Sequence, residues 1–119
     1  MKKIGQVRKV IDVTTKDLDE ILVGAFEGGS NYWLSKVKVV DDDYKGGEYA
    51  SDVIGLGGEL ILTTTEGEKH TLTQDMMIKG FQKYLDNGGM CFPFDSGNPD
   101  AWTYDMILQN ALFGEVVYG

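Results

Sequence analysis

The sequence has one cysteine, one histidine and no long apolar run. Cys91 is the only cysteine of 119 residues, which excludes a disulfide within the chain and fits a reducing, cytoplasmic compartment. The longest apolar runs span only a few residues, far short of the ~20 that a membrane-spanning helix needs. No secretory signal follows the first residues. These absences favour one soluble domain, residues 1–119, with no membrane partner.

Catalytic and metal-binding patterns are also missing. The single histidine leaves a Cys91–His70 dyad as the one nucleophile–base pair on offer, and a buried cysteine with an exposed histidine is the ordinary alternative. Nineteen acids are present, yet nothing singles out two of them as a catalytic pair. Neither glycine-rich phosphate-loop pattern occurs. We therefore predict a protein that is not an enzyme and has no cofactor or metal.

Positive charge is scarce. Eleven basic residues against nineteen acidic ones give a net charge of −8. An acidic domain is repelled by phosphate backbones, which argues against direct nucleic-acid binding. The same charge suits a protein partner that itself binds nucleic acid, because an acidic surface can occupy its basic groove. Solubility is the ordinary explanation of such a charge.

Three segments carry one apolar stripe each at helical spacing. Thr14 and Thr73 are expected to cap the first two helices, Asp100 or Thr103 the third, and Gly114 to end the third. The stripes are Leu18, Ile21, Leu22, Ala25 and Phe26; Met77, Ile78, Phe81, Tyr84 and Leu85; and Tyr104, Ile107, Leu108, Ala111 and Leu112. A further short helix is expected within 49–56.

Alternating apolar residues predict strands at 6–13, 32–40, 60–65, 69–73 and 115–118. The third and fourth flank a short glycine-containing connection at 66–68, the pattern of a β-hairpin. Single-sided helices are buried most simply when they pack together on a sheet. The predicted fold is α+β, with three helices on one face of a mostly antiparallel sheet of about four or five strands.

The most unusual string, Gly28 to Trp33, runs from a helix end into a strand. Adjacent glycines permit a sharp turn and close approach of another group, and the polar and aromatic side chains that follow suit a binding surface. The residues concerned are Ser30, Asn31, Tyr32 and Trp33. Tyr32 and Trp33 are consecutive in the predicted strand, so they face opposite sides and one is expected to be exposed. A helix cap followed by a core aromatic is the alternative.

Two turn-rich stretches are further candidates. Asp41, Asp42 and Asp43 offer oxygens to a cation, but the spacing matches no EF-hand, and a solvated turn is the simpler interpretation. Phe92 and Phe94 lie in a loop rich in glycine and acidic residues. They either form a contact surface or anchor the loop to the core.

Four strings resemble small uncharacterised proteins of phages and prophages of Gram-positive bacteria. They are AFEGGSNYW at 25–33, GEYAS at 47–51, YLDNGG at 84–89 and ALFGEVVYG at 111–119. The resemblance extends from about residue 17 to residue 119. It implies action in a bacterial host cytoplasm, and by analogy a counter-defence role. No catalytic residue is implied.

The leading hypothesis is a binding protein that inhibits a host defence protein, in the manner of an anti-CRISPR protein. Its surface would combine Asp41, Asp42 and Asp43 with an exposed aromatic. The alternative is a homo-oligomeric sponge for a small nucleotide signal, with Asn31, Tyr32 and Trp33 contacting the base. An enzyme is the third hypothesis.

Overall fold

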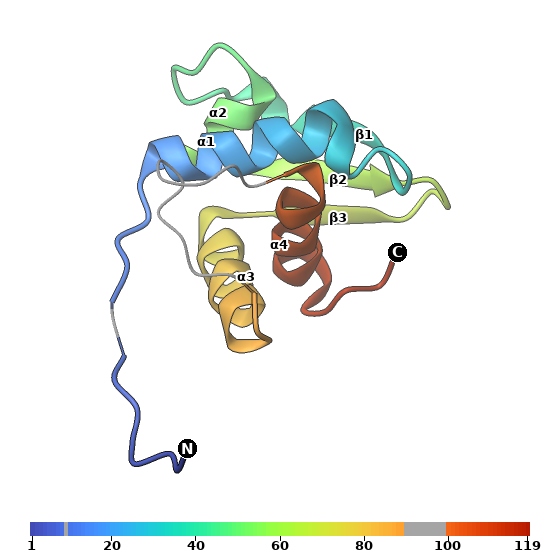
Figure 1. Cartoon of the computed structure of the whole chain (residues 1–119). Coiled ribbons are helices and arrows are strands. Elements are labelled where there is room, and N and C mark those ends of the chain that lie inside the picture. The colour runs from blue at the N-terminus through green and yellow to red at the C-terminus, as the bar shows by residue number, and fades with distance from the viewer. Residues whose placement is uncertain (9, 90–99) are drawn as a thin grey trace.

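The computed structural model describes residues 1–8, 10–89 and 100–119, in which four helices accompany one three-stranded sheet (Figure 1). The elements are α1 (Thr15–Gly24), a π-helical segment (Ala25–Gly29), β1 (Leu34–Val39), a 3-10 turn (Val40–Asp42), α2 (Ala50–Gly55), β2 (Leu60–Thr64), β3 (Lys69–Leu72), α3 (Gln74–Asp86) and α4 (Ala101–Phe113). The α+β class is confirmed. No helix of the described ranges is long and apolar enough to cross a membrane.

Local signals place the ends of the three long helices. The Thr14 side chain accepts the Asp17 backbone N–H, and the Asp17 carboxylate in turn accepts the Thr14 N–H, a complete capping box. Thr73 caps α3 through the Met76 N–H. Asp100 caps α4 through the Thr103 N–H, and Gly114 ends that helix in the left-handed conformation at φ 77°.

The sheet is antiparallel in the order β1-β2-β3. Val39, Leu60 and Leu72 lie across from one another and are buried, and Val37, Leu62 and His70 form the neighbouring row. Lysines and threonines alternate with them and leave the other face partly exposed. Residues 65–68 connect β2 and β3, so the predicted hairpin forms with a connection one residue longer than expected.

The helices form two pairs around one hydrophobic core (Figure 1). α1 packs against α2, and α3 lies beside α4, with the strands running behind them. The second pair approaches closely at Gly80, where a Cβ atom would lie 2.4 Å from the Cα of Ala111. α4 also packs against α1 and β3 and is therefore buried on almost every side.

Two predicted strands do not form, so four or five strands was an overestimate and the described sheet has three. Residues 6–8 and 10–13 alternate in polarity as expected but pair with no described strand, and Val7 is 100% exposed. Residues 115–118 run back along α4 in an irregular path, because a glutamine side chain, and not a strand, binds their backbone. Alternation shows only that a strand is permitted; pairing needs an available edge.

Candidate functional site

The string from Gly28 to Trp33 surrounds a buried carboxylate of α4. Asp105 is 1% exposed, and its Oδ1 accepts hydrogen bonds from Ser30 Oγ at 2.8 Å and Trp33 Nε1 at 2.7 Å. Its Oδ2 accepts from Tyr32 OH at 2.5 Å and Gln109 Nε2 at 3.1 Å. A buried carboxylate is tolerated when donors surround it, and here four donors converge on two oxygens. We call Ser30, Tyr32, Trp33, Asp105 and Gln109 the Asp105 network.

The same network holds the C-terminal segment against the body. Gln109 Oε1 accepts the backbone N–H groups of Val117 and Tyr118, both at 2.8 Å, while its Nε2 donates to the Tyr118 carbonyl at 3.2 Å. The Tyr118 ring lies parallel to the Trp33 indole with centroids 5.4 Å apart. Phe113 meets the same indole edge-on at 5.3 Å. Two strings whose starts are 83 residues apart, 28–33 and 111–119, thus form one unit.

This arrangement gives most of the predicted binding string a structural role. Ser30 and Trp33 are fully buried, so Trp33 cannot stack on a ligand in this conformation. Tyr32 is 53% exposed, so one of the two aromatics is exposed as predicted, but both lie in the turn before β1 (Leu34–Val39) and not in a strand, and the Tyr32 hydroxyl points inward to Asp105. Burial, followed by the hydrogen bond to Asp105, raises the pKa of Tyr32 to about 12. Asn31 is exposed beside them.

Asp105 and Gln109 were not among the predicted site residues. Neither belongs to the apolar stripe predicted for that helix, yet every residue from Tyr104 to Leu112 is buried. The available signal was their spacing: an acid and an amide at i and i+4 share one helix face and can bond to each other. This spacing indicates a buried polar pair only when the other sides of the helix are known to be buried as well.

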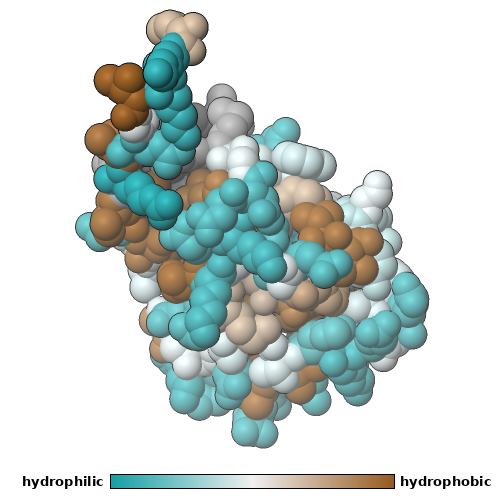
Figure 2. Space-filling view, turned by 90° about the horizontal axis from the view of Figure 1, so that it is seen from below, coloured by the Kyte–Doolittle hydropathy of each residue, from teal (hydrophilic) through white to brown (hydrophobic). Residues whose placement is uncertain are grey.

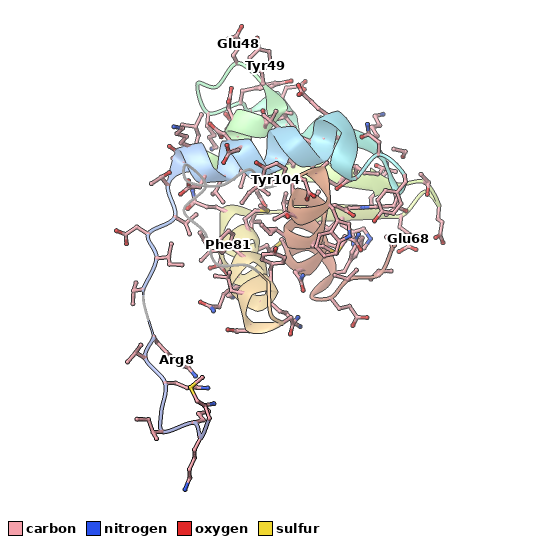
Figure 3. All side chains as sticks on the ribbon, in the orientation of Figure 1. Arg8, Glu48, Tyr49, Glu68, Phe81 and Tyr104 are labelled. Carbon is pink, nitrogen blue, oxygen red and sulfur yellow. The ribbon has the colours of Figure 1, made fainter. Side chains whose placement is uncertain are left out.

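A second region concentrates carboxylates on the outside. Between residues 40 and 59 the acids are Asp41, Asp42, Asp43, Glu48, Asp52 and Glu59, and the only base is Lys45. We call these six carboxylates the acidic end; Glu48 and Tyr49 mark it in Figure 3. Asp41, Asp42 and Asp43 are exposed as predicted. Within the described ranges the Asp41 and Asp42 side chains make no ion pair or hydrogen bond.

The backbone of the acidic end is both strained and fixed. Asp41, Asp42 and Lys45 have φ values of 57°, 52° and 54°, in the left-handed region that side-chain-bearing residues rarely occupy. Asp43 accepts the Lys45 N–H at 3.1 Å and the Lys45 ammonium at 2.9 Å, and that lysine lowers the pKa of Asp43. Strain of this kind persists where the surroundings impose it, and it clusters at functional sites.

Helix α2 supports this loop and extends its acidic surface. The Asp52 carboxylate accepts the backbone N–H groups of Glu48 at 3.1 Å and Tyr49 at 2.9 Å, which anchors the loop to the helix. Burial, with the nearby charge of Asp52, raises the pKa of Asp19 on α1. Carboxylates of α1 and α2 therefore lie close together. Tyr49 is exposed next to them, so an aromatic ring accompanies the charge.

A hollow of ≈ 440 Å³ lies between the end of α3 and the start of α4. Its walls include Tyr84, Trp102, Met106 and Asn110, and Trp102 is exposed. Asn31, Tyr32 and Trp33 do not line it. Phe92, Phe94 and Cys91 lie outside the described residues, so the predictions made for them stay predictions.

The described ranges contain no group of three or more histidine, cysteine, aspartate or glutamate side chains placed to hold a metal ion. Comparison of the chain with protein-family models, with curated protein sequences and with solved structures gives no match. The geometry of the Asp105 network and of the acidic end is therefore the basis for a functional proposal.

Proposed function

We propose that this protein is a non-enzymatic binding protein whose acidic end occupies a basic, nucleic-acid-binding surface of a host protein. The observation that supports it is the acidic end itself, which has six carboxylates against one lysine between residues 40 and 59 and a strained loop that hydrogen bonds anchor to α2. Complementary charge speeds encounter and selects basic partners. The resemblance to phage and prophage proteins favours a host defence protein as the partner, in the bacterial cytoplasm.

Most of the binding free energy is assigned to tyrosines that lie beside the carboxylates. Exposed carboxylates alone add little affinity in salt, since water and ions screen them. Tyrosines are frequent hot spots because they bury a large rigid area and keep a hydroxyl for hydrogen bonding. Tyr49 and Tyr44 both stand exposed at the acidic end. We therefore assign long-range attraction to the aspartates and contact affinity to the tyrosines.

The test measures whether the purified protein displaces DNA or RNA from host nucleic-acid-handling proteins in a gel-shift assay. The double variant Asp41→Asn with Asp42→Asn should weaken displacement and flatten its dependence on salt concentration. Its matched control is Glu27→Gln with Glu115→Gln, which removes two exposed carboxylates elsewhere. Tyr49→Ala should weaken displacement at every salt concentration. Equal loss in the two double variants would contradict the assignment to the acidic end.

The alternative, a sponge for a small nucleotide signal, is favoured by one observation: the ≈ 440 Å³ hollow beside Trp102. That volume falls in the range of small-molecule sites. Asn31, Tyr32 and Trp33, which were predicted to contact the base, do not line this hollow. We therefore place the nucleotide of this alternative in the hollow beside Trp102. Native mass spectrometry after incubation with lysate of infected cells tests it. A small molecule retained by the native chain and lost by Trp102→Ala supports the sponge, whereas one retained equally by both contradicts this site.

A further inference from the structure

The chain before α1 forms an arm whose apolar side chains are exposed to solvent. Figure 1 shows this arm leaving the start of α1 and extending away from the body. Ile4 is 99% exposed, Val7 100% and Val10 90%. Ile11 and Val13, closer to the helix, are partly covered. Single exposed apolar residues are ordinary, but three on one extended segment form a surface that water solvates poorly.

Charge separates the arm from the body. The first eleven residues contain Lys2, Lys3, Arg8 and Lys9 and no acid, whereas all nineteen acids and the other seven bases follow. A basic apolar arm therefore belongs to a body with a charge of −12. The surface that complements this arm is apolar and acidic. The body itself is repelled by nucleic acid and by anionic lipid, which are the other surfaces that attract basic segments.

The chain offers an apolar surface along α3 that has one carboxylate, Asp86, at its edge, on a body that is acidic as a whole. A hollow of ≈ 670 Å³ lies between the arm and this helix, and its helix wall includes Ile78, Phe81, Leu85 and Asp86. Ile78 is 41% exposed. Figure 2 shows hydrophobic side chains both on the arm and on the neighbouring part of the body. Val7, Arg8 and Val10 of the same chain's arm form part of the opposite wall of this groove, but Val7 and Val10 remain exposed, so the arm does not close onto α3 within a single copy.

We propose that the arm of one copy binds the α3 groove of a second copy, and the reverse, so that the protein self-associates by exchanging arms. Val7 and Val10 of each copy supply the apolar contact, and Arg8 faces the acidic side of the groove at Asp86. Exchange of an identical element between two copies is a common route to a symmetric dimer, because each copy offers both halves of the contact.

The test is sedimentation velocity of the full chain over a wide concentration range. The native chain should form a dimer that dissociates on dilution and weakens with salt. Val7→Asp with Val10→Asp should raise the dimer dissociation constant by at least about tenfold, because burying a valine favours association and burying a carboxylate opposes it. Both valines are exposed in a single copy, so its fold should be unaffected. Val117→Asp, another exposed valine, is the matched control and should dimerise as the native chain does.

A mixing experiment separates arm-to-groove binding from other modes. Ile78→Lys should also abolish the dimer, because it places a positive charge in the groove, which opposes both the valines and the basic residues of the arm. Mixing this groove variant with the arm variant restores one intact contact per pair, so a heterodimer should appear although neither variant dimerises alone. A native chain that stays monomeric at all concentrations overturns the proposal. So does a dimer unaffected by either change, or an arm that binds anionic vesicles or DNA while the chain remains monomeric.

Discussion

The Asp105 network and the acidic end use the same chemical group in opposite surroundings. Asp105 is enclosed, and four donors of its own chain satisfy its oxygens. Asp41 and Asp42 are exposed on strained backbone with no partner in the described ranges. A carboxylate whose partners lie within the chain stabilises the fold, whereas carboxylates held in place without partners are available to another molecule. The difference separates structural residues from candidate binding residues.

The largest expected effect comes from removing the enclosed carboxylate. Asp105→Leu leaves the Trp33 N–H and the Ser30 hydroxyl buried without an acceptor. We expect the free energy of unfolding to fall by about 3–5 kcal/mol. Urea denaturation followed by far-ultraviolet circular dichroism measures it. Tryptophan fluorescence should also shift to the red, since Trp33 lies at the centre of the network.

Glu115→Leu is the matched control, because Glu115 is an exposed carboxylate just after α4. Its effect should stay within about 0.5 kcal/mol. Comparable losses in the two variants would mean that the Asp105 network contributes no more than a surface charge. Enclosure by donors would then not distinguish Asp105 from the exposed carboxylates of the acidic end.

The sequence predicted what local chemistry determines. Thr14, Thr73 and Asp100 cap their helices as expected, because a cap needs only residues within one turn. The role of Asp105 could not be predicted, since its partners Ser30 and Trp33 are more than 70 residues away in the sequence. The sequence of α4 also predicts a helix with only one buried face. The predicted strand at 6–13 failed for a related reason: alternation is a property of the segment, and pairing depends on the rest of the chain.

The candidate site also has some features that the sequence predicted and others that it did not. Exposure of Asp41, Asp42 and Asp43 follows from a polar turn and was expected. The structural role of Trp33 was left open in the sequence, because the predicted strand at 32–40 does not say which of its sides is enclosed. In the structure the strand begins only at Leu34, and it is the turn before it that encloses Trp33 and exposes Tyr32. The φ values of Asp41 and Asp42 had no sequence signal, since aspartate enters the left-handed region without requiring it.

Alkaline pH should weaken the Asp105 network before it affects the acidic end. The pKa of Tyr32 in the folded protein is raised from 10.0 to about 12, so its neutral form is favoured by folding. That contribution is complete below about pH 10 and is lost as pH rises through about 12. Unfolding free energies measured by urea denaturation across this window should therefore decline.

In Tyr32→Phe the decline should be shallower than in the native chain. Some of it will remain, because burial also raises the pKa of Tyr104 and of Tyr118. Tyr49→Phe is the matched control and should decline as the native chain does, since Tyr49 is exposed and its hydroxyl makes no hydrogen bond in the described ranges. Parallel curves for native chain and Tyr32→Phe would show that the Tyr32 hydroxyl contributes nothing to this pH dependence.

The smallest expected change has the opposite sign and concerns the acidic end. Asp41→Gly relieves left-handed strain of about 1 kcal/mol, partly offset by the greater freedom of glycine in the unfolded chain, so we expect a net gain of about 0.5 kcal/mol. Asp43→Gly is the matched control: its φ of −91° gives no relief, and it loses the bonds from Lys45. Stability should therefore fall in the control while host-protein binding weakens in both variants. A loss of stability in Asp41→Gly equal to that in the control would mean that the strained backbone stores no free energy, leaving charge alone to distinguish this end.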